Sequence, residues 1–179
     1  MLQLHCVMAK ETTQYVNSLA LLPGAQRLIA GYDDGTIEIW DTETGKQEQT
    51  SMKHKQGVID LVVTRDGTKL VSTGNCDGGG EIKVWNVDSH TLLEKWTRPH
   101  TQVTVAISPD DRLIAIGDKR LILRHLDGGQ EIKHPIKLKG KVYSMSFSPD
   151  GRKLACAIST DAVIRLNKAL SRVRGRRTK

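Results

Sequence analysis

His54, Ser72 and Asp77 are residues whose types could support catalysis. In a hydrolase triad, a histidine held by a carboxylate takes the proton of a serine hydroxyl. The same residue types are also common as hydrogen-bonded structural groups in folded proteins. We favour a structural role, so the sequence predicts a protein that is not an enzyme and has no catalytic residues.

The three cysteines, Cys6, Cys76 and Cys156, are widely spaced and form no CxxC pair. This spacing supports neither a zinc site nor a disulfide framework, so we expect no metal and no cofactor. Free cysteine commonly packs as a small apolar residue. We expect Cys156, which lies between two alanines, to be buried in a strand, and Cys76 to lie in a loop. The cysteine pattern indicates a reducing compartment, the cytoplasm or the nucleus.

The glycine-rich segment 74–80, GNCDGGG, could be imagined as a phosphate-binding loop. It lacks the GK[ST] ending of a P-loop and leads into a strand rather than a helix. Gly140-Lys141 fails the same test, because Val142 follows. We interpret the glycine-rich segment as a lengthened, mobile turn.

The stretch 34–41, DGTIEIWD, contains the pattern that positions these residues. Asp34-Gly35 is a turn signal, since both residue types tolerate positive φ. Ile37 and Ile39 then lie on one face of a strand and Glu38 on the other, which predicts a half-buried strand. The pattern returns at 81–86 and more weakly at 120–125 and 162–167. A spacing of roughly 40 to 45 residues is typical of four-stranded propeller blades.

The chain divides into four such units. We place them at 16–53, 54–99, 100–139 and 140–167, with an N-terminal strand or extension at 1–15 and a basic tail at 168–179. The first two strands of each unit are separated by a turn signal, at 23–25, 64–67, 108–111 and 148–151. Short strands between such turns predict an all-β fold. The outer strand is missing from the fourth unit, where the basic tail follows.

Segments 34–41 and 148–155 (SPDGRKLA) closely resemble the repeats of WD-repeat β-propeller proteins. The resemblance covers nearly all of residues 16–167. It implies a β-propeller of about four four-stranded antiparallel blades, and a non-catalytic scaffold that binds proteins or peptides through its loops. We expect an open arc of blades rather than a closed ring, with self-association through exposed blade faces.

The resemblance also implies one network of a histidine, a hydroxyl, a tryptophan and an aspartate in each blade. The second repeat matches it with His54, Ser72, Asp77 and Trp85; the first keeps Asp34 and Trp40 but has Ala30 in the hydroxyl position. The third keeps His100, with Arg124 in the tryptophan position and Ala115 in the hydroxyl position; the fourth has Cys156, Asn167 and Asp161. Three of the four networks are therefore expected to be incomplete.

Polar or large residues beside each first strand are the candidate partner contacts. They are Tyr15, Asn17, Gln56, Asp60, Gln102, Thr104, Tyr143 and Met145. These positions flank the loops on which partners of the family dock.

The net charge of +7 is a property of the C-terminal segment. Residues 168–179 carry six of the 27 basic residues and no acid, which leaves 27 − 6 = 21 basic against 20 acidic residues. The basic residues are Lys168, Arg172, Arg174, Arg176, Arg177 and Lys179. Such a run could bind nucleic acid or direct nuclear import, which is our alternative function. The aromatic content of 4% offers little for stacking on single-stranded nucleic acid.

A membrane partner is not expected. No apolar run approaches the roughly 18 residues of a membrane span. Residues 1–10 lack the basic and apolar regions of a signal peptide.

Overall fold

The computed structural model describes residues 14–48, 52–128, 131–132, 135–160 and 164–165. All regular elements in these ranges are strands, so the predicted all-β class is confirmed. The chain forms two compact units, Met1–Thr101 and Gln102–Lys179, and each is described by itself. Among the described residues there is no helix long and apolar enough to cross a bilayer.

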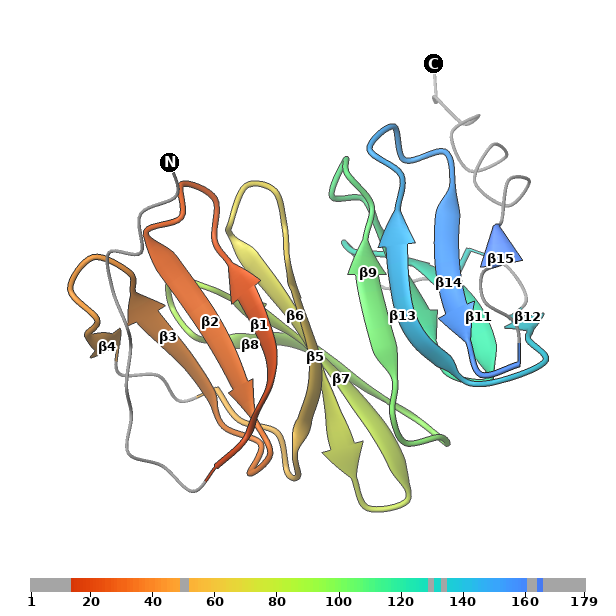
Figure 1. Cartoon of the computed structure of the whole chain (residues 1–179), viewed down its shortest axis with the longest axis horizontal. Coiled ribbons are helices and arrows are strands. Elements are labelled where there is room, and N and C mark those ends of the chain that lie inside the picture. Colours follow the sequence, from red (N-terminus) through yellow and green to blue (C-terminus); the bar gives the residue numbers. More distant parts are fainter. Residues whose placement is uncertain (1–13, 49–51, 129–130, 133–134, 161–163, 166–179) are drawn as a thin grey trace. The chain divides into compact units, whose positions relative to one another are not determined.

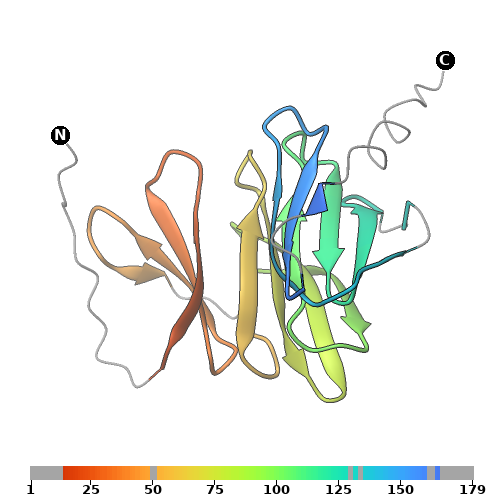
Figure 2. The same ribbon diagram turned by 45° about the vertical axis from the view of Figure 1, so that its right-hand side comes forward.

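Two antiparallel sheets of four strands form the first unit and lie side by side (Figures 1 and 2). The first sheet has the order β1-β2-β3-β4, with β1 (Val16–Leu21), β2 (Arg27–Tyr32), β3 (Ile37–Asp41) and β4 (Gln47–Glu48). The second has the order β5-β6-β7-β8, with β5 (Val58–Val63), β6 (Lys69–Cys76), β7 (Gly79–Asn86) and β8 (Leu92–Arg98). Neighbouring strands in each sheet are consecutive in the chain.

The second unit repeats this arrangement. Its first sheet contains β9 (Thr104–Ile107), β10 (Leu113–Gly117), β11 (Arg120–His125) and β12 (Ile136–Lys137). Its second sheet contains β13 (Val142–Phe147), β14 (Leu154–Ile158) and β15 (Ile164–Arg165), the three strands found there among the described residues. Every sheet falls within one of the four units delimited from the sequence.

The turns between first and second strands follow the predicted signals. The N–H of the fourth turn residue donates to the carbonyl of the first, from Gly67 to Thr64 at 3.0 Å and from Gly151 to Ser148 at 2.8 Å. The aspartate between them fixes the turn, because Asp150 accepts hydrogen bonds from the Ser148 hydroxyl at 2.6 Å and from the Arg152 N–H at 2.9 Å. Local sequence therefore determines these turns.

The same packing arrangement holds the two sheets of each unit together. We call the side of a sheet that carries Leu19, Leu61 or Met145 its front face and the opposite side its back face. In the first unit, Ile29 and Ile39 on the back face of the first sheet pack against Leu61 and Leu70 on the front face of the second. A shared apolar core therefore joins sheets that are each too thin to bury their side chains alone.

In the second unit, the back face of the first sheet again covers the front face of the second. The core combines Ala115 and Leu123 with Leu154 and Cys156, and Met145 packs against it. Cys156 is buried in β14, as predicted.

Two local predictions are wrong. β3 is not half-buried, since Glu38 is buried like its neighbours Ile37 and Ile39. The second concerns the glycine-rich segment, which is described next. The predicted polar strand through about Met52 includes β4, but residues 49–51 lie outside the described residues; Met52 is buried in the core.

Segment 74–80 is part of a hairpin rather than a mobile loop. β6 continues to Cys76 and β7 begins at Gly79, which pair with each other. Gly78, with φ of +85°, closes the two-residue turn. A Cβ at Gly79 would collide with the backbone oxygen of Arg98, so glycine is needed where β7 approaches the end of β8.

Candidate functional site: a buried polar network in the second sheet

His54 lies just before the second sheet and is held there by backbone and packing. Its N–H donates to the carbonyl of Gly35 at 2.8 Å. Its ring covers Gly74 of β6, where an added Cβ would lie 2.5 Å from the ring Cγ. Glycine at position 74 therefore makes the room that the imidazole needs.

The structure brings three of the four predicted network residues into one hydrogen-bond chain. The His54 Nε2 lies 2.7 Å from the Ser72 Oγ, and the Trp85 Nε1–H donates to the same oxygen at 2.8 Å. All three side chains are buried. Ser72 therefore joins a histidine from outside the sheet to a tryptophan on β7.

The fourth member of the network is Glu81 rather than Asp77. The His54 Nδ1 lies 3.1 Å from the Glu81 Oε2, and Glu81 is buried at the start of β7. Asp77 lies at the exposed end of the β6–β7 hairpin, where its carboxylate accepts hydrogen bonds from Lys55 and from Gln56. The prediction for Asp77 is therefore wrong. The β6–β7 pairing continues past Gly74, which the His54 ring covers, and places Asp77 at the end of the hairpin, away from the ring.

Lysines compensate the buried Glu81 charge. The Lys83 Nζ lies 2.9 Å from the Glu81 Oε2, donates to the Lys53 carbonyl at 2.7 Å, and lies 5.5 Å from the centre of a Trp85 ring. The Lys95 Nζ lies 3.5 Å from the other carboxylate oxygen. Burial raises the pKa of Glu81, but the Lys83 hydrogen bond and the charges of Lys83, His54 and Lys95 outweigh it and lower the pKa overall.

His54 is neutral at pH 7. Burial, followed by the charge of Lys83, lowers its pKa from 6.5 to about 4, although Glu81 acts in the opposite direction. A neutral ring with its proton on Nδ1 satisfies every member: it donates to Glu81 and accepts from the Ser72 hydroxyl, which accepts from Trp85. We assign this tautomer from the hydrogen-bond network.

Ser72, His54 and Glu81 have the order of contacts found in a catalytic triad, yet the surroundings favour a structural role. A nucleophilic serine needs access to substrate, whereas Ser72 is fully buried. Its oxygen also accepts the indole N–H. In the described part of the chain, no group of three or more His, Cys, Asp or Glu side chains could hold a metal ion. The hydrogen bonds of His54 to Ser72 and Glu81 instead hold the second sheet in place.

The first sheet has a different polar arrangement. Asp34 accepts hydrogen bonds from the Thr36 N–H at 2.8 Å and from its hydroxyl at 2.9 Å, which fixes the turn before β3. Trp40 packs with Ala30 and Tyr32. Burial, and then a hydrogen bond with Glu38, raise the pKa of Tyr32 to about 12.

Strand register refines the comparison in the second unit. Ser72 pairs with Leu61, and Cys156 pairs with Met145 in the same position. In β10, Ala115 pairs with Ala106 and faces the back, so Ile116 and not Ala115 takes the hydroxyl position. The predictions for Asp161, Asn167 and the basic tail lie outside the described residues.

The comparisons with known proteins agree with these geometries. Residues 4–41 and 132–166 match the family model described as WD domain, G-beta repeat. The chain therefore contains WD repeats. Its four sheets are therefore blades, and we number them 1 to 4 along the chain.

Named relatives of this WD-repeat protein differ widely in their roles. It is 28% identical over 165 residues to apoptotic protease-activating factor 1 of Homo sapiens, a match that spans 85% of the chain and 13% of the relative. It is 30% identical over 149 residues to U3 small nucleolar RNA-associated protein 15 of Saccharomyces cerevisiae, covering 82% of the chain and 28% of the relative.

A third relative is eukaryotic translation initiation factor 3 subunit I of Culex quinquefasciatus. The identity is 26% over 148 residues, 73% of the chain and 44% of the relative. The chain thus spans less than half of each of these three relatives.

Five of the candidate partner contacts are exposed. They are Tyr15, Asn17, Gln56, Gln102 and Tyr143, although Gln56 also donates a hydrogen bond to Asp77. Thr104 is buried, which contradicts its prediction as a partner contact.

Asn17, Asp60 and Met145 also make contacts within the molecule. The Asn17 Nδ2 donates to the Val58 carbonyl at 2.9 Å, and Asp60 accepts from the Leu61 N–H at 3.0 Å. Met145 packs against the core of the second unit. These side chains contribute to packing between or within blades.

Glu81 and Lys83 are the network residues that the sequence analysis missed. A signal was present, because alternate residues of a strand share one face and Trp85 lies on the face of positions 81 and 83. The residues two and four positions before Trp85 lie on its face of the strand, and they are Lys83 and Glu81.

Proposed function

We propose that this WD-repeat protein is a non-catalytic scaffold that binds protein or peptide partners through its blade loops. The observation that carries the proposal is the exposure of Tyr15 and Tyr143, which precede or begin the first strands of blades 1 and 4. Exposed tyrosines provide contact area at low conformational cost and are enriched at protein interfaces. The burial of the triad-like residues supports a non-enzymatic role.

The relatives support a role in assemblies of varied kinds. Their names refer to apoptotic protease activation, to a small nucleolar RNA and to translation initiation. A fold that occurs in such different settings supplies surfaces rather than one chemistry. We propose the cytoplasm or the nucleus as the compartment.

The alternative function is nucleic-acid association through the basic residues of 168–179. It is favoured by their charge and by the name of the yeast relative. Binding of this kind weakens steeply with salt, because phosphate contacts release counterions.

The test compares partners captured by the full chain and by residues 1–167, using affinity purification and mass spectrometry at two salt concentrations. The scaffold proposal expects the same protein partners with both chains and a weak salt dependence. Loss of all partners on tail removal, or on nuclease treatment, would instead support the alternative.

A second experiment compares variants to locate the partner-binding surface. Tyr15→Ser and Tyr143→Ser, made separately, should each reduce capture of at least one partner. Leu92→Ser is the matched control, because it removes an exposed apolar side chain from β8, away from the first strands. Equal loss with all three variants would contradict docking beside the first strands.

A further inference from the structure

The two units show independently how one blade covers the next. In each, a back face packs on a front face, with blade 1 covering blade 2 and blade 3 covering blade 4. Leu61 of blade 2 is 6% exposed as a result. This arrangement predicts what the exposed part of a front face requires as its partner.

The front face of blade 1 exposes two leucines of β1, at the positions of Leu61 and Val63 in blade 2, whereas Ala30, Glu38 and Trp40 on the same face are buried. Leu19 pairs with Ala30 as Leu61 pairs with Ser72, and Leu21 pairs with Leu28 as Val63 pairs with Leu70. Leu19 is nevertheless 58% exposed and Leu21 is 52% exposed. Adjacent exposed leucines on a sheet face indicate an interaction surface.

The back face of blade 4 carries small side chains at one paired position of β13 and β14. Ser146 pairs with Ala155 in the position where Ala20 pairs with Ile29 in blade 1, and both residues are exposed. These small side chains leave room for larger ones from a partner. Large residues packed against small ones fill space at the density of protein interiors.

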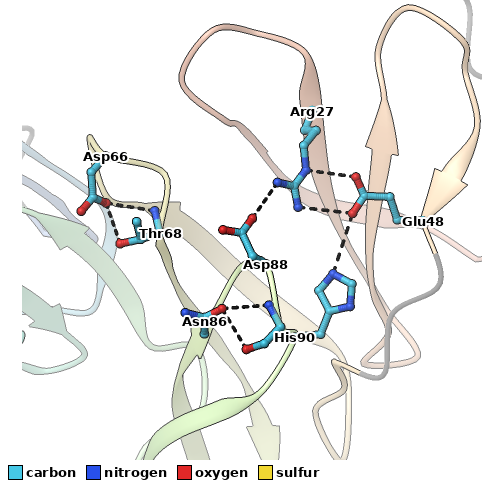
Figure 3. Close-up of polar contacts among 8 residues, drawn as sticks. Arg27, Glu48, Asp66, Thr68, Asn86, Asp88 and His90 are labelled. Carbon is cyan, nitrogen blue, oxygen red and sulfur yellow. Dashed lines mark hydrogen bonds and ion pairs between the residues drawn. The ribbon is translucent and has the colours of Figure 1, made fainter.

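Charge complementarity selects the same pair of faces. Where blade 1 covers blade 2, the Arg27 guanidinium lies 3.0 Å from the Asp88 carboxylate (Figure 3). Glu43 takes the place of Asp88 in blade 1, since it follows the Asp41 turn as Asp88 follows the Asn86 turn. In each turn, the side chain of Asp41 or Asn86 accepts a hydrogen bond from the backbone N–H three residues later.

Lys153 takes the place of Arg27 in blade 4. The carbonyl of Lys153 accepts the Ser148 N–H, as the carbonyl of Arg27 accepts the Leu22 N–H. Lys153 and Glu43 are both exposed and of opposite charge. The contact between faces would therefore repeat the arginine–aspartate pair with a lysine and a glutamate.

We propose that the front face of blade 1 binds a second copy of this chain, whose blade 4 covers it with its back face. Lys153 of that copy pairs with Glu43. The surface lies on sheet faces and is separate from the loop contacts of the proposed function.

Sedimentation velocity of the full chain over a concentration series tests the proposal, and a concentration-dependent dimer is expected. Leu19→Glu with Leu21→Glu should raise the dimer Kd about 10- to 100-fold or more, because two apolar contacts are lost. The control is Leu92→Glu with Leu93→Glu on β8, at 45% and 48% exposure, which should leave the Kd unchanged. Circular dichroism verifies folding of every variant.

A charge exchange tests the register. Glu43→Lys or Lys153→Glu alone should weaken the dimer about 2- to 5-fold, and the double variant should restore it. A monomer at every concentration, which is also the result of closure within one chain, would overturn the proposal. So would equal effects of the Leu19/Leu21 and Leu92/Leu93 variants, or failure of the double charge variant to recover.

Discussion

Replacing Ser72 by alanine is the most informative perturbation of the buried network. The hydroxyl satisfies two other side chains, since it donates to the His54 Nε2 and accepts from the Trp85 Nε1–H. Removing it leaves two buried polar atoms unpaired, at about 1–3 kcal/mol each. We therefore expect Ser72→Ala to lower the free energy of unfolding by about 2–5 kcal/mol, allowing for partial relaxation.

Trp85→Phe provides the other side of a double-mutant cycle. It removes the indole N–H but leaves the hydrogen bond between Ser72 and His54. The loss of unfolding free energy from missing hydrogen bonds should therefore be smaller than in Ser72→Ala. In the double variant the tryptophan donor no longer needs a partner. The double variant should therefore lose less stability than the sum of the losses of the two single variants, by more than about 0.5 kcal/mol.

Urea unfolding followed by tryptophan fluorescence is the suitable assay. All three tryptophans, Trp40, Trp85 and Trp96, lie in the first unit, so the signal reports on the unit that contains the network. Trp40 and Trp96 keep the signal in the Trp85→Phe variant. A loss below about 1 kcal/mol for Ser72→Ala, or strict additivity in the cycle, would refute the hydrogen-bond chain.

Three further outcomes are expected. The pKa of His54 is about 4 in the folded chain and 6.5 in the unfolded chain, so the unfolded chain binds a proton first as the pH is lowered. The free energy of unfolding should therefore fall as the pH is lowered from 6.5 to 4, by up to about 3 kcal/mol. A urea midpoint that is constant from about pH 7 to about pH 4.5 would contradict this. Gly74→Ala should cost about 1–3 kcal/mol or more in the same assay, because its methyl group meets the His54 ring; a neutral effect would place the ring elsewhere. Cys76 should react with a thiol reagent faster than Cys156, whose pKa burial raises to about 11; labelling of the native chain in the reverse order would contradict the strand register.

The sequence determined the strands and turns, because both depend on neighbouring residues. Alternation in 34–41 predicted β3, and the aspartates at 66 and 150 predicted the turns that they cap. Repetition of these local signals every 40 to 45 residues or so was enough to predict four antiparallel sheets. His54, Ser72 and Trp85 were predicted from the resemblance to WD-repeat proteins, whose network residues lie at regular positions relative to the strands.

Only the tertiary structure decided which acid contacts His54. Asp77 was chosen by its place near the turn, but pairing of β6 with β7 continues beyond the histidine and carries Asp77 to the exposed hairpin end. Glu81 lies opposite Gly74, the residue that the imidazole covers. Choosing between two nearby acids required the hairpin length, which glycine-rich sequence did not indicate.

Burial likewise depends on the neighbouring blade. Alternation predicted one exposed face for β3, yet Glu38 is buried like Ile37, and a hydrogen bond joins its side chain to buried Tyr32. The leucines of β1 show the reverse, since Leu19 is exposed where the equivalent Leu61 is covered by blade 1. Identical local patterns thus acquire different environments, because solvent exposure is set by sheets that are distant in sequence.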